Sequence, residues 1–223
     1  MVQLSIDTSS VNCAVHLLPR DGSSFEISNT IGRGHAERLI GMIDHALNEC
    51  GFSSSDISKI AVTIGPGSFT GVRVGLAAAR GYALALDIPV VGVSTLKALS
   101  KKNDAASSTL VILDAKRDQF YAELFDDAGD TLEGPTLYSK GDGVPEAWRT
   151  QTNLALVGTG AETIAALLPN ATVKSTEAAP AIADVALLGE ALKSETTPPK
   201  PLYLRAADAK PQNPDKIIAR VPS

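Results

Sequence analysis

Cysteine, histidine and aromatic residues are all scarce in this chain of 223 residues. Its two cysteines and three histidines are too few for a disulfide framework or a structural zinc site. No apolar run reaches the roughly 18 residues that would suggest a membrane-spanning helix. Acidic residues outnumber basic ones by 25 to 20. This balance argues against a protein that binds nucleic acid by itself, because phosphate binding needs clustered lysine and arginine. Free thiols and an N-terminus without a basic signal segment predict a cytoplasmic protein.

The apolar pattern predicts two rounds of strands and helices. The first round comprises strands at 2–7, 12–18 and 23–28, a helix at 34–50, a strand at 60–64, a helix at 71–86, a strand at 89–93 and a short helix to 100. The second comprises strands at 109–114, 119–125 and 131–138, a helix at 145–150, a strand at 154–157 and helices at 161–168 and 179–193. A proline-rich tail after 195 is expected to be extended. We therefore expect an α/β protein of two lobes, 1–104 and 105–223, with the second lobe abbreviated.

The most distinctive stretch is IGPGSFTGVRVGL at 64–76. A β-branched strand runs into Gly-Pro-Gly, and Ser68 or Thr70 can cap the helix that follows. Such a loop can present backbone N–H groups to an anion or a partner, although it matches neither the P-loop nor the dinucleotide-binding motif. A purely structural corner is the alternative.

The helix after this loop is apolar nearly all round and rich in alanine and glycine. One side is expected to lie on the sheet, and the other to meet a second helix or a second protein. Its only charges are Arg73 and Arg80. Glu37 or Asp44 of the preceding helix could pair with them, and so could an acidic group of a partner.

Four segments resemble the TsaB (YeaZ-like) family, which is also filed under glycoprotease, peptidase M22-like names. They are IDTSS at 6–10, GHAERLI at 34–40, IGPGSFTGVRVGLAAARGYALALDIPVVGVSTLKAL at 64–99 and PLYLR at 201–205. Between about 105 and 195 the resemblance is looser. It implies an actin/Hsp70-like (ASKHA) two-lobed fold in which a βββαβα topology is duplicated.

The resemblance also implies a non-catalytic scaffold for TsaD, the enzyme that transfers a threonylcarbamoyl group to N6 of adenosine 37 in ANN-decoding tRNAs. TsaB-like proteins form a heterodimer with TsaD, which the small ATPase TsaE joins, and they can homodimerise through the same helices. Contact with tRNA is then expected only through the complex, and contact with membranes is not expected. No cofactor of its own is expected, while ATP or ADP and a metal can bind in the assembled complex.

Two groups of site residues follow from the resemblance. The expected partner-binding residues lie on the helices at 35–50 and 71–86: His35, Glu37, Arg38, Leu39, Met42, Arg73, Leu76, Ala79 and Arg80. Glutamate at Leu76 or Ala79 is expected to abolish complex formation and to leave the fold largely intact. The expected remnant of a nucleotide site comprises Asp7, Thr8, Gly65, Gly67 and Ser68. For Asp7, the alternative is an Asx-type turn cap.

The sequence departs from the TsaD-like sequences at two positions. TsaD-like sequences carry His-x-x-x-His after the strand that corresponds to 89–93, whereas Thr95 and Leu99 stand there in this chain. Neither side chain is a useful ligand for a transition metal. The scaffold hypothesis therefore has two rivals that lack a clear site, a glycoprotease-like metallopeptidase and an ATP-binding actin-like ATPase that uses Asp7 and the 65–71 loop.

Overall fold

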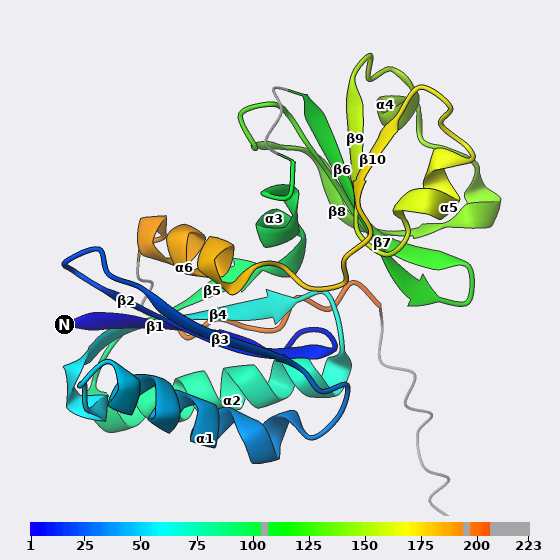
Figure 1. Ribbon diagram of the computed structural model, residues 1–223. Helices are drawn as coiled ribbons and strands as arrows, with labels where there is room; N and C mark the ends of the chain where they lie inside the picture. Colours follow the sequence, from blue (N-terminus) through cyan, green and yellow to red (C-terminus); the bar gives the residue numbers. More distant parts are fainter. Residues whose placement is uncertain (104–106, 194–196, 206–223) are drawn as a thin grey trace, which may run out of the picture.

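Two five-stranded sheets, each formed by one half of the chain, make up the framework of the protein (Figure 1). The computed structural model describes residues 1–103, 107–193 and 197–205. Strand order is β3-β2-β1-β4-β5 in the first sheet and β8-β7-β6-β9-β10 in the second. In each sheet the first three strands in sequence are antiparallel and the last two are parallel. The duplicated βββαβα topology is thus confirmed.

The element boundaries agree with the predicted ones to within a few residues. The first half contains β1 (Val2–Asp7), β2 (Asn12–Pro19), β3 (Phe25–Thr30), α1 (His35–Glu49), a 3-10 turn (Ser54–Asp56), β4 (Ile57–Gly65), α2 (Phe69–Leu86), β5 (Val90–Ser94) and α3 (Thr95–Ser100). The second contains β6 (Ser108–Lys116), β7 (Gln119–Phe125), β8 (Thr131–Ser139), a 3-10 turn (Lys140–Asp142), α4 (Glu146–Arg149), β9 (Leu154–Val157), α5 (Ala161–Ala165), β10 (Thr172–Ser175) and α6 (Ile182–Ala191). Only β10 was not predicted, because its four residues show no apolar alternation.

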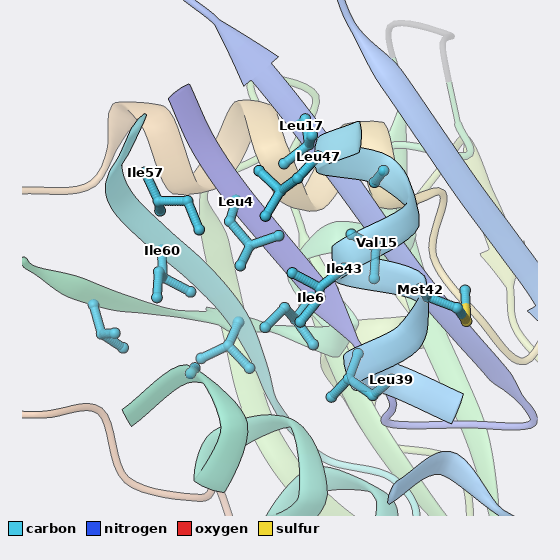
Figure 2. Packing of buried hydrophobic residues seen from close by; sticks show 14 of the residues in the cluster. Leu4, Ile6, Val15, Leu17, Leu39, Met42, Ile43, Leu47, Ile57 and Ile60 are labelled. Atoms are coloured by element: carbon cyan, nitrogen blue, oxygen red, sulfur yellow. The ribbon is translucent and has the colours of Figure 1, made fainter. Parts of the chain in front are cut away.

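Helices cover both faces of the first sheet. On one face α1 and α2 lie side by side, and on the other lies α6 (Figure 1). Because both faces are covered, every residue of β1 is buried. Leu39, Ile43 and Leu47 recur at four-residue intervals along α1, so they share a face and point toward the leucine, isoleucine and valine side chains of β1 and β2 (Figure 2).

The second half of the chain returns to the first sheet through α6. Ile182 and Val185 pack against Ala61 and Val91 of the first sheet. A side chain at Gly189 would overlap the Ala61 side chain, so α6 approaches β4 closely. Residues of α6, which lie beyond position 104, therefore complete the core of the first sheet. The division of the chain into lobes at residue 104 stays a prediction.

The chain then crosses the first half again in extended form. We call residues 199–205 the C-terminal strap. Leu202 N–H donates to the Ile64 carbonyl at 2.8 Å, and the Arg205 guanidinium donates to Gln119 of the second sheet. Residues 201–205 thus dock onto the chain itself. Most of the predicted extended tail, residues 206–223 with 195 and 196, lies outside the described residues. Among the described helices, none is long and apolar enough to cross a membrane.

Candidate partner-binding face and the closed Asp7 loop

Helices α1 and α2 present a joint outward surface, which we call the α1–α2 face. On α2, residues Arg73, Ala77, Arg80 and Leu84 follow one another at intervals of four, three and four, so they share a side of the helix, and all four are exposed. Leu84 is 87% exposed, and Ile40 on α1 is 45% exposed. Small residues are exposed beside them, Gly41 on α1 and Gly81 and Ala85 on α2, whereas the rest of the outward side of α1 is mainly charged or polar. Along α2 several of the exposed side chains are small, so a second helix could approach it closely.

Five of the predicted partner-binding residues do not lie on this face. Leu39, Leu76 and Ala79 are at most 2% exposed, and His35 and Met42 are also buried. Four of them, Leu39, Met42, Leu76 and Ala79, belong to the core that α1 and α2 form with the sheet, so their burial does not favour a role in direct contact, which stays a prediction. Because Leu76 and Ala79 are buried, we expect glutamate at either position to destabilise the fold, contrary to the expectation from the sequence. The other four, Glu37, Arg38, Arg73 and Arg80, are exposed.

Sequence reasoning missed the outward residues, above all Leu84 and Ile40. Apolar and small residues surround α2 on every side, so its sequence gives no contrast that tells the sheet-facing side from the outward side. On α1 the contrast is stronger, but Ile40 is an apolar residue among exposed neighbours. One usable signal was the position of Leu84, which falls on the same side as Arg73 and Arg80.

Both arginines of α2 contact the C-terminal strap instead of the carboxylates that were considered for them. Arg73 Nε donates to the Tyr203 hydroxyl at 2.7 Å, and Arg80 Nη2 donates to the Pro199 carbonyl. Within the described ranges, neither arginine forms an ion pair. Pairing with Glu37 or Asp44 is therefore not what holds them.

Asp7 lies at the end of β1 and is completely buried. Its Oδ1 accepts hydrogen bonds from Ser9 N–H at 2.9 Å, Ser9 Oγ at 2.6 Å and Thr63 Oγ1 at 2.7 Å. The bond from the residue two positions on is the Asx-type turn that the sequence offered as an alternative. Oδ2 is buried and has no partner among the described atoms. Removal from water raises the pKa of this carboxyl, although the hydrogen bonds from Ser9 and Thr63 act in the opposite direction.

The glycine loop closes over this turn. Side chains at Gly67 and Gly71 would overlap the carbonyl oxygens of Ser9 and Thr8, so glycine is required for the close approach. Ser68 N–H donates to the Ser9 carbonyl at 2.7 Å, and Thr8 Oγ1 donates to the Gly71 carbonyl at 2.8 Å. Ser68 Oγ accepts from Gly71 N–H at 3.2 Å and caps α2 as predicted.

The predicted nucleotide-site residues are thus brought together, with Gly65 beside Leu202 of the strap. Their polar groups bond to Ser9, Thr63 and Gly71 of the surrounding turn, strand and helix, and the carboxyl of Asp7 is inaccessible to solvent. Whether the cluster descends from a nucleotide site stays a prediction.

The segment of α3 where TsaD-like sequences carry the histidine pair is part of the core in this chain. Thr95 and Leu99 of α3 are fully buried. The three histidines lie apart. His16 is buried in β2, where loss of solvent lowers its pKa. The Nε2 atom of His35 lies 3.1 Å from the Asn12 carbonyl oxygen, and His45 is exposed beside Glu49. Across residues 1–103, 107–193 and 197–205, no three His, Cys, Asp or Glu residues are placed to hold a metal ion.

Comparison with known proteins gives a consistent picture. Residues 27–210 match the family model described as TsaD, tRNA N6-adenosine threonylcarbamoyltransferase. The Bacillus subtilis tRNA threonylcarbamoyladenosine biosynthesis protein TsaB is 36% identical over 134 residues, which cover 60% of this chain and 58% of that protein. The Escherichia coli protein of the same name is 36% identical over 121 residues, which cover 53% and 52%. The chain therefore spans about half the length of the curated TsaB relatives it matches.

Two further relatives extend over most of the chain. An uncharacterized Mycobacterium tuberculosis protein is 37% identical over 179 residues, which cover 80% of this chain and 79% of that protein. A crystal structure from Pseudomonas aeruginosa, described as similar to peptidase YEAZ, is 28% identical with a TM-score of 0.74. It covers 92% of this chain and 99% of its own, so the two-lobed fold is shared along nearly the whole length.

Proposed function

The chain belongs to the TsaB/YeaZ family, and on that premise we propose that it is a non-catalytic partner of TsaD in tRNA threonylcarbamoylation. In this role it holds TsaD in a conformation that transfers the threonylcarbamoyl group to N6 of adenosine 37 of ANN-decoding tRNAs. The names of its Bacillus and Escherichia relatives, tRNA threonylcarbamoyladenosine biosynthesis proteins, support a role in this modification. The family model that it matches carries the name of the transferase itself, which supports a common ancestry of scaffold and enzyme.

The observation that carries the proposal is the α1–α2 face. Leu84 is 87% exposed on a helix whose outward side otherwise carries mainly alanine, glycine and arginine. A leucine in this position loses water only when another surface covers it. Small residues on either side allow a second pair of helices to pack at the interaxial distance of about 8–10 Å that closely packed helices adopt. We therefore place the TsaD contact on this face.

The remaining partners and cofactors follow from the same role. TsaE would join the heterodimer, and tRNA would be reached through the complex, as the acidic excess of this chain suggests. A homodimer through the α1–α2 face would compete with TsaD for the same surface. We propose that the chain holds no cofactor by itself, that ATP or ADP and a metal belong to the assembled complex, and that the complex works in the cytoplasm. The metallopeptidase and ATPase alternatives gain no support from the buried Asp7 or from the position of Thr95.

Reconstitution tests the proposal directly. This chain is mixed with TsaD from the same source, the mixture is resolved by size-exclusion chromatography with light scattering, and each peak is assayed for tRNA modification with TsaE and the threonylcarbamoyl donor present. We expect a heteromeric peak that modifies tRNA, with neither protein active when the other is withheld. Full modification by TsaD in the absence of this chain would contradict the proposal, and so would peptide hydrolysis or ATP turnover by this chain alone.

A further inference from the structure

We propose that the C-terminal strap is part of the partner-binding surface, because it holds Arg73 and Arg80 as a cationic edge that receives carboxylates of the partner. This inference rests on the proposed function, since the partner is the protein that covers the α1–α2 face. It adds to that function a segment, residues 199–205, that lies more than a hundred residues from either helix in sequence.

Arg73 is held by two aromatic rings, that of Phe69 at the start of α2 and that of Tyr203 in the C-terminal strap. Its guanidinium carbon lies 3.8 Å from the centroid of the Phe69 ring and 5.7 Å from that of Tyr203. The two rings are 5.3 Å apart and both are about half exposed. Stacking and the Nε bond to the Tyr203 hydroxyl fix the plane of the guanidinium. The terminal nitrogens have no partner among the described atoms, and they present a fork that matches a carboxylate.

Arg80 extends the same edge. Seven residues separate it from Arg73, so the two side chains leave α2 on the same side, about 10 Å apart along the axis. The Pro199 carbonyl accepts from only one of its nitrogens, which leaves the others available. Since α2 contains no acidic residue and neither arginine forms an ion pair within the described ranges, the positive charge along this edge is not neutralised by direct contact.

The expected partner is a helix with two carboxylates about two turns apart. Such a helix can lie along α2, cover Leu84, and place one carboxylate on each arginine. Across the face, α1 offers the opposite charge through the exposed Glu37 and Asp44, which are also seven residues apart. Arg38 is also exposed on α1, so α1 carries mixed charges while the exposed charges of α2 are only positive, and this difference favours one orientation of the partner.

The test compares three changes for their effect on the dissociation constant with TsaD, at low and at high salt. Arg73→Gln removes the charge, Tyr203→Phe removes only the hydroxyl that orients it, and Arg149→Gln removes an exposed arginine of the second half as a matched control. At low salt we expect Arg73→Gln to weaken binding about tenfold and Tyr203→Phe about threefold. Arg149→Gln should have no effect. The salt dependence of binding should flatten for Arg73→Gln and, to a smaller degree, for Tyr203→Phe, with thermal unfolding unchanged in all three.

Leu84→Glu serves as a reference that separates this inference from the proposed function. If Leu84→Glu abolishes the complex while Arg73→Gln binds with the affinity and salt dependence of the wild type, the strap inference is wrong and the proposed function stands. If Leu84→Glu also binds normally, the proposed contact face fails as well. Light scattering on the chain alone tests whether a second copy of this chain occupies the same surface. Loss of a homodimer in Arg73→Gln, with TsaD binding unchanged, would assign the edge to self-association and overturn the proposal.

Discussion

The two halves of the molecule share one strand order but differ greatly in their helices. Between the third and fourth strands stands α1 with 15 residues in the first half and α4 with 4 in the second. Between the fourth and fifth strands stands α2 with 18 residues, against α5 with 5. Short helices suffice to cover a sheet of this size, because Trp148 of α4 and Ile164 of α5 are both buried in the second core. The extra length of α1 and α2 therefore supplies an outward surface in addition to their share of the core.

The last helix of each half contacts the other half. Leu96 and Leu99 of α3 pack with Val111 and Phe125 of the second sheet, while α6 covers the first sheet. The halves are thus joined by an exchange of helices, and the C-terminal strap adds a third connection. Neither half completes its core alone, so each core draws on residues from both sides of the 101–108 linker.

The largest effect is expected where α2 meets the sheet. Leu76→Glu places a charge in a site that is 2% exposed, and we expect it to lower the free energy of unfolding by about 3–5 kcal/mol. Chemical denaturation followed by circular dichroism measures this. A variant as stable as the wild type would mean that α2 is not part of the first core, and the contrast between the two halves would then be lost.

In both halves, a glycine that follows the fourth strand packs so closely against its neighbours that a side chain would not fit. Side chains would overlap Thr8 at Gly71 in the first half, and Ile112 and Phe120 at Gly160 in the second. We expect Gly71→Ala and Gly160→Ala each to cost about 1–3 kcal/mol of unfolding free energy. Gly81→Ala, which has open space on the outward side of α2, should instead gain about 0.5–1 kcal/mol from helix propensity. Equal effects at Gly71 and Gly81 in thermal unfolding would refute the close approach.

Two aspartates in corresponding places should respond to pH in opposite directions. Burial raises the pKa of Asp7 above 3.8, so the native state holds its proton longer and the carboxylate destabilises the fold as pH rises above 3.8. A hydrogen bond from Lys116 lowers the pKa of Asp114 below 3.8, with a backbone bond and the charge of Lys116 acting in the same direction. That carboxylate stabilises the fold above pH 3.8, and the stabilisation is lost as pH falls through the lowered pKa.

Measured relative to the wild type, the stability of Asp7→Asn should therefore increase as pH rises above about 4. That of Asp114→Asn should decrease as pH rises toward about 4 from below, and should change little at higher pH. Urea unfolding from acid pH to neutrality gives both slopes. The Asp114 effect should be the smaller of the two, because this side chain is partly exposed and its partner Lys116 is 81% exposed. Slopes of the same sign would show that the two turns are electrostatically alike.

The smallest effect on stability is expected on the α1–α2 face itself. Leu84→Glu and Leu187→Glu both change an exposed leucine of a helix, on opposite sides of the first sheet. Each should alter the free energy of unfolding by less than about 0.5 kcal/mol. A loss of several kcal/mol in Leu84→Glu would mean that Leu84 is covered in the isolated chain.

Sequence reasoning was most successful where a local pattern determines the structure. The two rounds of strands, the cap at Ser68 and the extended backbone of the proline-rich 199–205 segment all follow from short-range rules about alternation, capping and proline. It failed at β10, which is too short for a pattern, and at the direction in which α2 faces, because its apolar residues surround the helix. Orientation depends on what the sheet covers, and the path of the strap over Arg73 depends on contacts between residues 130 positions apart. Neither is encoded within a local window.

The most direct test of the central claim, that the long helices of the first half form the TsaD-binding face, is the affinity of Leu84→Glu for TsaD beside that of Leu187→Glu. Both variants are first shown to unfold like the wild type. The account predicts that Leu84→Glu no longer forms the heterodimer and no longer supports tRNA modification, while Leu187→Glu does both normally. Wild-type affinity in Leu84→Glu would contradict it, and loss of binding only in Leu187→Glu would move the contact to the α6 side of the sheet.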